Sequence, residues 1–272
     1  MSIFQGKVCV VTGGGSGLGL SICLQLASRG AHVIIADIQE EAASETAKII
    51  TSQGKGTAVP KQLDVTDPAA VEKLIQDVVD RFGKLDYMFN NAGIIVIGEF
   101  RDIPLVEIQK VIDVNLTGAL NGSYYAYQLM VKQGFGHIVN TASGFGLAPG
   151  PSYLPYVTSK FGVVGMSESL RMEGADLGVS VSVVCPGYIR TPLIEKLRTY
   201  RAEPKEAVSL IPVKLLEPDK AAEVILRGVE KNKPIIMFPS YVRFLVSMYR
   251  MFPRAFLSYA LKNIRSFRKI RI

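Results

Sequence analysis

A glycine-rich loop near the amino terminus constrains the fold of this chain more than any other stretch. The apolar run Val8–Val11 ends in this loop, which leads directly into a helical pattern beginning at Leu20. A strand, a turn with few side chains and a helix N-terminus form an anion site, because backbone N–H groups point outward and the helix dipole attracts negative charge. The glycines do not fit the spacing G-x-G-x-x-G. They fit T-G-x-x-x-G-x-G through Thr12, Gly13, Gly17 and Gly19. We expect a pyrophosphate there, the alternative being a glycine turn without a ligand.

Strands and helices alternate along the chain after this loop. The patterns predict strands at about 32–37, 57–63, 85–89, 137–141, 179–185 and 234–238, and helices at about 40–52, 67–82, 104–132 and 153–177. This alternation indicates βαβ units and a parallel sheet covered on both faces. The predicted fold is one α/β domain with a doubly wound, Rossmann-like sheet, and 272 residues can bury a large core. Ligands of such sheets bind beyond the carboxyl ends of the strands.

The net charge of +7 is unevenly distributed. Ten of the 31 basic residues follow Glu230 and none of the 24 acidic residues does, which leaves 21 basic residues before that point. The body is therefore mildly acidic and the tail strongly basic. A charge confined to one amphipathic tail argues against nucleic-acid binding.

The cysteines and histidines form no recognisable metal or disulfide pattern. Cys9, Cys23 and Cys185 are odd in number and widely spaced, so we expect reduced, buried thiols in a cytoplasmic protein and no metal. His32 and His137 stand at the starts of expected strands and are interpreted as surface residues. The chain lacks a basic start followed by an apolar core, and it lacks a run of roughly 18 apolar residues. We therefore expect neither a signal peptide nor a spanning helix.

Tyr156 and Lys160 lie four residues apart in an expected helix and so share one face. A lysine ammonium beside a phenol favours the phenolate and would lower the tyrosine pKa from its usual value of about 10. Such a tyrosine can act as general acid and base for an alcohol and its ketone. Ser143, 13 residues before Tyr156, follows an expected strand and could hydrogen-bond the substrate oxygen.

Four motifs in this order resemble the short-chain dehydrogenase/reductase family over about residues 5–192. They are the glycine loop, Asn90-Asn91-Ala92-Gly93, the serine followed by Tyr-x-x-x-Lys, and Pro186-Gly187 followed by Thr191. The resemblance implies hydride transfer between a nicotinamide and a carbon bearing oxygen. Two alternatives remain open: a different reaction on the same scaffold, such as epimerisation or dehydration, and a non-catalytic protein that senses cofactor or docks on membranes.

The resemblance also implies individual roles. The catalytic set would be Asn115, Ser143, Tyr156 and Lys160, with Asn115 supporting a proton-relay water. Cofactor contacts would come from Gly13, Ser16, Gly17, Leu18, Gly19, Asp37, Asp64, Val65, Asn91, Tyr156, Lys160, Pro186, Ile189 and Thr191. The carboxylate of Asp37 would bind the adenosine ribose and repel a 2′-phosphate. NAD is therefore the expected cofactor.

The expected substrate pocket is uncharged. It would be bordered by Ser143, Phe145, Leu147, Tyr153, Tyr188 and Leu193. Such a pocket suits a lipophilic alcohol or ketone of the steroid, retinoid, terpenoid or fatty-chain type.

The chain divides into an expected catalytic domain, 1–240, and a basic helical tail, 241–272. The tail has apolar and basic faces in two segments separated at Pro253. It could lie on an anionic membrane, or pack on its own domain as a lid, or contact a second subunit. The resemblance implies that the long helices carrying Asn115 and Tyr156 pair two subunits, giving a homodimer or a homotetramer.

Overall fold

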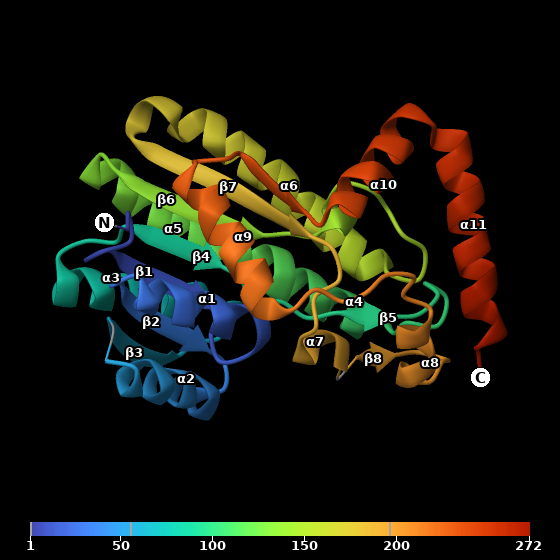
Figure 1. Cartoon of the computed structure of the whole chain (residues 1–272), viewed down its shortest axis with the longest axis horizontal. Coiled ribbons are helices and arrows are strands. Elements are labelled where there is room, and N and C mark those ends of the chain that lie inside the picture. The colour runs from blue at the N-terminus through green and yellow to red at the C-terminus, as the bar shows by residue number, and fades with distance from the viewer. Residues whose placement is uncertain (1, 55, 196) are drawn as a thin grey trace.

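A parallel sheet forms the centre of the molecule (Figure 1). The structure is a computed structural model that describes residues 2–54, 56–195 and 197–272, and in this part of the chain the sheet has seven strands. Their order is β3-β2-β1-β4-β6-β7-β9, and every neighbouring pair is parallel. The sheet runs outward in both directions from β1, so a crevice opens between β1 and β4 at the carboxyl ends of the strands. The doubly wound α/β fold is confirmed.

The strands are short and mostly buried. Their bounds are β1 Val8–Thr12, β2 His32–Asp37, β3 Thr57–Gln62, β4 Tyr87–Asn90, β6 Gly136–Thr141, β7 Val179–Pro186 and β9 Ile235–Phe238, with a small separate pair of β5 Val96–Ile97 and β8 Arg198–Thr199.

Helices cover both faces of the sheet, and the last two helices of the chain lie past its edge (Figure 1). Their bounds are α1 Gly17–Ser28, α2 Glu40–Ser52, α3 Pro68–Phe82, α4 Leu105–Ile112, α5 Gly118–Gln133, α6 Leu154–Gly174, α7 Pro192–Glu195, α8 Pro204–Ser209, α9 Pro218–Glu230, α10 Ser240–Met251 and α11 Pro253–Lys269. In the described residues, no helix is both long and apolar enough to cross a bilayer.

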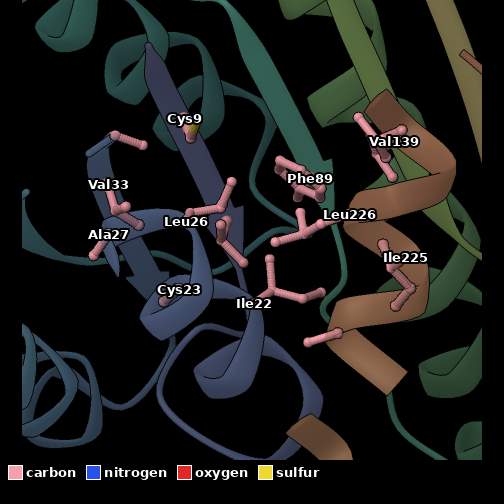
Figure 2. Close-up of a cluster of buried hydrophobic side chains, with 14 of the residues drawn as sticks. Cys9, Ile22, Cys23, Leu26, Ala27, Val33, Phe89, Val139, Ile225 and Leu226 are labelled. Atoms are coloured by element: carbon pink, nitrogen blue, oxygen red, sulfur yellow. The ribbon is translucent and has the colours of Figure 1, made fainter. Parts of the chain in front are cut away.

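The alternation of side chains along β1 builds the two halves of the core. Cys9 and Val11 pack into the layer under α1, α2 and α9, whereas Val8 and Val10 pack into the layer under α3 and α5. Figure 2 shows the first layer, where side chains of α1 and α9 meet over the strands: Ile22, Leu26, Ile225 and Leu226. The cysteines Cys9, Cys23 and Cys185 are buried free thiols, as expected.

Local sequence signals account for helix α3. The Asp67 carboxylate caps its start by accepting from the N–H groups of Ala69 at 2.9 Å and Ala70 at 3.2 Å. Pro68 occupies the first turn, where a missing N–H costs nothing. Gly83 ends the helix with φ of 74°. The predicted span of this helix is confirmed.

The structure corrects two predictions about elements. The single helix expected over 104–132 is divided into α4 and α5 by a π-helical turn, Asp113–Thr117. The strand expected at 85–89 is β4, Tyr87–Asn90, so Asn90 is its last residue.

His137 is not a surface residue. It lies within β6, buried, with Nε2 at 2.9 Å from Ser182 Oγ on neighbouring β7. Burial lowers the pKa of His137 to about 4. His32 is half-buried in β2, with Nδ1 at 2.6 Å from Thr57 Oγ1. Both histidines lie inside strands and hydrogen-bond across the sheet.

Candidate functional site

The glycine loop makes room for a ligand against the backbone. Gly13 and Gly17 have φ of 63° and 52°, in the left-handed region that residues other than glycine rarely adopt. A Cβ at Gly19 would lie 2.0 Å from the carbonyl oxygen of Gly13, so only glycine fits there. Helix α1 starts at Gly17 with no side-chain cap and no acidic residue in its first turn. Its first N–H groups and its dipole are therefore available to an anion.

The carboxyl ends of β2 and β3 supply two aspartates. Asp37 accepts from the N–H of Gly15 at 2.9 Å through Oδ2 and from the N–H of Gln39 at 3.0 Å through Oδ1. Asp64 instead caps its own turn, with Oδ1 accepting from Thr66 N at 2.9 Å and Thr66 Oγ1 at 2.7 Å. Both aspartates line the same cavity as the glycine loop.

The two adjacent asparagines after β4 have different places. Asn90 is buried, where its amide donates to Asn140 Oδ1 at 2.8 Å and Ser123 Oγ at 3.1 Å. Asn91 lies on the cavity wall, with Nδ2 donating to the carbonyl of Thr12 at 3.1 Å. Thr12 in return accepts the N–H of Asn91 at 2.9 Å through Oγ1. This pair ties the β4 loop to the glycine loop.

Ser143, Tyr156 and Lys160 meet on one wall of the cavity. The first turns of α6 carry Tyr156 and Lys160, and Ser143 follows β6. Lys160 Nζ lies 5.5 Å from the centre of the Tyr156 ring and donates to the carbonyl of Thr141 at 2.8 Å. A serine hydroxyl, a phenol and an amine therefore face the same space.

Burial dominates the electrostatics of this trio. It raises the pKa of Tyr156 to about 12, a rise that hydrogen bonding with Ser143 partly offsets. It lowers the pKa of Lys160 to about 8. The expectation that Lys160 depresses the tyrosine pKa is therefore not met in this structure, because both groups have lost their water.

Asn115 does not line the cavity, and its side chain holds the segment at Ile94 in place. The π-helical turn presents its amide to Ile94, whose N–H donates to Oδ1 at 2.7 Å and whose carbonyl accepts from Nδ2 at 2.9 Å. The same Nδ2 donates to Ser159 Oγ at 3.1 Å. A Cβ on Gly93 would lie 3.1 Å from Asn115 Oδ1 and 3.6 Å from Lys160 Nζ, so both side chains approach Gly93 closely.

All fourteen predicted cofactor residues line one cavity of about 940 Å³. Five of the six predicted pocket residues do so as well: Ser143, Phe145, Tyr153, Tyr188 and Leu193. The exception is Leu147, which is buried with Val242 and Val246 behind the loop. The short helical turn Gly144–Gly146 directs its side chain into the core.

Aromatic rings surround the open space beside Tyr156. Phe145 stacks on Tyr153 with ring centres 4.7 Å apart. It meets Tyr156 and Tyr188 edge-on, at 6.4 Å and 6.1 Å. This part of the cavity is apolar apart from Ser143, Lys160 and the tyrosine hydroxyls.

The basic tail contributes a wall of the cavity that the motifs did not reveal. It supplies Tyr241, Val242, Phe244, Leu245, Val246, Phe256, Tyr259, Ala260, Asn263, Ser266 and Phe267. Tyr241 Oη accepts the N–H of Tyr188 at 2.9 Å, and a Cβ on Gly187 would lie 2.0 Å from that oxygen. The only available signal was the apolar face of α11, and it could not identify what that face covers.

Ion pairs hold the end of the tail against the segment that follows β5. Arg268 donates to both oxygens of the nearly buried Glu99, from Nε at 3.1 Å and from Nη2 at 3.0 Å. Its guanidinium holds the pKa of Glu99 below the usual range. Arg271 donates to Asp102 Oδ1 at 2.7 Å. The tail therefore packs on its own domain, and its outer side is left for a membrane or a second subunit.

Known proteins share this architecture. The family model described as short chain dehydrogenase matches residues 7–202. A cyclohexanol dehydrogenase from an Acinetobacter species is 36% identical over 243 residues, which cover 88% of this chain and 94% of that protein.

Two further similarities cover almost the whole chain. A probable oxidoreductase of Mycobacterium tuberculosis, EphD, is 36% identical over 270 residues, which are 94% of this chain and 45% of that protein. The chain thus spans about half the length of that relative. The crystal structure of a short chain dehydrogenase/reductase from Burkholderia phymatum in complex with NAD has a TM-score of 0.85 and 27% identity, covering 94% of this chain and 96% of that one.

Proposed function

The chain belongs to the short-chain dehydrogenase/reductase family, and from this we propose that it transfers a hydride between NAD(H) and an apolar secondary alcohol or its ketone. One observation carries the proposal. Ser143, Tyr156 and Lys160 converge on the wall of a cavity that also contains the unshielded start of α1. A proton-transfer group and an anion site therefore share one space.

The residues present fit a dinucleotide. The loop at Gly13–Gly19 admits a backbone-bound pyrophosphate because a Cβ at Gly19 would collide with the loop itself. Asp37 would bind the adenosine ribose, and Thr191, which packs against Gly17, would lie beside the nicotinamide. The bound dinucleotide supplies or accepts the hydride.

The chain's own residues handle the proton. With a pKa of about 12, Tyr156 is protonated at neutral pH and can donate its proton to a ketone oxygen, which leaves a phenolate. In the reverse direction that phenolate would take the proton of the alcohol. Ser143 would hold that oxygen by a hydrogen bond. Burial lowers the pKa of Lys160 to about 8, and the charge of its protonated form would favour the phenolate form of Tyr156.

Asp37 supports NAD over NADP. Two backbone N–H groups hold its carboxylate at the cavity edge, where it would oppose a 2′-phosphate. The next residue, Ile38, brings no positive charge to offset it. Buried free thiols support a reducing compartment such as the cytoplasm as part of the same proposal.

The aromatic half of the cavity supports the proposed substrate class. Phe145, Tyr153 and Tyr188 present ring surfaces beside Tyr156. The tail adds further apolar side chains, Phe256 and Phe267 among them. A bulky apolar alcohol or ketone suits such a wall, and the similarity to a cyclohexanol dehydrogenase supports a secondary alcohol.

The test measures NADH formation with a panel of secondary alcohols, from short aliphatic ones to steroids. Wild-type protein is compared with Tyr156→Phe, and NADP⁺ serves as a parallel arm. We expect NAD⁺ and bulky apolar alcohols to be preferred, and kcat to fall by roughly 100-fold or more in the variant. Binding of NADH to Tyr156→Phe, followed by fluorescence, controls for folding.

Other results would reject parts of the proposal. Undiminished turnover in Tyr156→Phe would exclude the assigned proton donor. A preference for NADP⁺ would reject the role given to Asp37. Product formed without net NADH would indicate an isomerising or dehydrating relative instead.

A further inference from the structure

The helices α10 and α11 form a hairpin at one edge of the molecule (Figure 1). Its inner side is packed: Tyr249 and Phe256 lie edge-on with ring centres 5.1 Å apart, and Val246 joins Phe256 in the same buried cluster. Phe267, further along α11, packs into the cluster that contains Tyr156. The hairpin is therefore part of the folded domain, and its outer side faces solvent.

The outer side carries large apolar residues. At the tip of the hairpin, Met251 and Phe252 are 69% and 61% exposed. Leu257 and Leu261 are also exposed and lie one turn apart on α11, opposite the cavity-lining face. Four such exposed side chains therefore lie within eleven residues of the hairpin. We call these four residues the tail strip.

Positive charge surrounds the tail strip. Arg250 and Arg254 flank the tip, and Lys262, Arg265 and Lys269 follow along α11. Within the described residues, none of these five has a carboxylate within 4.0 Å, unlike Arg268 and Arg271. The chain after Glu230 has no acidic residue. The hairpin thus combines exposed apolar groups with uncompensated cations.

We propose that the tail strip and its flanking cations dock on an anionic lipid bilayer. Apolar side chains insert at the boundary between headgroups and acyl chains, while lysine and arginine stay at the headgroups. A second copy of this chain fits the strip less well, because a two-fold contact would bring cations of like sign together. The proposal is independent of the hydride-transfer chemistry.

The position of the strip gives docking a consequence. Phe244 on α10 and Asn263 on α11 are both exposed and both line the cavity, so the cavity opens along the hairpin. A bilayer bound to the outer side would then lie beside the cavity mouth. Apolar substrates dissolved in the bilayer would have a short path to Tyr156.

The experiment is co-sedimentation of the full chain with vesicles. One set is phosphatidylcholine alone and the other is equal parts phosphatidylcholine and phosphatidylglycerol. Two variants test the surface: Met251→Ser with Phe252→Ser, and Arg250→Glu with Arg254→Glu. Each has a matched control on the body: Ile49→Ser with Val224→Ser for exposed apolar residues, and Lys132→Glu with Lys220→Glu for the same change in net charge.

We expect wild type and both controls to bind the anionic vesicles, with binding weakened by high salt. Each tail variant should bind at least roughly tenfold more weakly. The far-UV circular dichroism spectrum should be unchanged in all variants, which establishes that they are folded. Wild-type protein that binds neither vesicle, or tail variants that bind as wild type does, would overturn the proposal. So would self-association lost only in the tail variants without vesicle binding, since a second copy would then cover the strip.

Discussion

At the scale of single residues, two glycines can be compared: the glycine loop requires Gly19, whereas a larger residue could replace Gly165. A Cβ at Gly19 would lie 2.0 Å from the Gly13 carbonyl oxygen, whereas a Cβ at Gly165, inside α6, meets nothing within 4 Å. We expect Gly19→Ala to weaken NADH binding by at least roughly tenfold, because the loop must move away from the ligand. Gly165→Ala should leave binding unchanged and raise the free energy of unfolding by up to about 1 kcal/mol.

Fluorescence titration with NADH and urea unfolding measure the two effects. Equal NADH affinity in Gly19→Ala and wild type would show that the glycine loop does not hold the dinucleotide. An equal loss of affinity in Gly165→Ala would show that the effect is not specific to the glycine loop, and the role given to Gly19 would be rejected.

Residues whose environment is local in sequence were predictable. The cap at Asp67 depends on N–H groups only two and three positions away, so its sequence signature sufficed. His137 is buried and its hydrogen-bond partner, Ser182, lies 45 positions away, so no sequence pattern near His137 indicates its environment. The pKa of Tyr156 is a similar case, because the lost water that raises it depends on everything packed around the ring.

At the scale of elements, the end of α11 is held by Glu99 in the segment after β5. Arg268 donates hydrogen bonds to both carboxylate oxygens of Glu99. Arg265, one turn earlier, has no carboxylate within 4.0 Å in the described part of the chain. We expect Arg268→Ala to increase amide hydrogen exchange in residues 262–272 by roughly tenfold and to raise the KM for bulky alcohols. Arg265→Ala should change neither. Unchanged exchange in Arg268→Ala would show that apolar packing alone holds the helix.

The sequence predicted the bounds of an element where its hydrophobic periodicity matched one regular geometry throughout. The prediction was wrong where the geometry changed within a helix. The helix over 104–132 kept its apolar pattern through the π-helical turn Asp113–Thr117, so the turn was not visible. It brings Asn115 to Ile94 and lets Gly118 approach Val65, to which a Cβ would come within 2.6 Å. Such turns are frequent at functional sites. The role of α11 was ambiguous for another reason, since an apolar face does not specify its partner.

At the scale of the whole molecule, each of the chain's two ends builds a wall of one cavity. The first half provides the glycine loop and the carboxyl ends of β1 to β4, and the tail covers the aromatic region beside Tyr156. Glu99 and Arg268, 169 positions apart, connect the two halves. The motif order identified the first wall because each motif follows a strand. The second wall arises only from tertiary packing.

Pairing of two chains is the remaining whole-molecule expectation, and α5 and α6 offer the surface for it. Leu120 and Tyr124, one turn apart on α5, are 48% and 55% exposed, and Phe161 and Met172 are exposed on α6. We propose that a two-fold contact buries these side chains. Light scattering should then give twice the mass of one chain. Leu120→Glu with Tyr124→Glu should give the mass of one chain, because buried unpaired carboxylates would oppose association. Ile49→Glu, an exposed site on α2, should remain a dimer. A tetramer that both variants preserve would mean that the contact lies elsewhere.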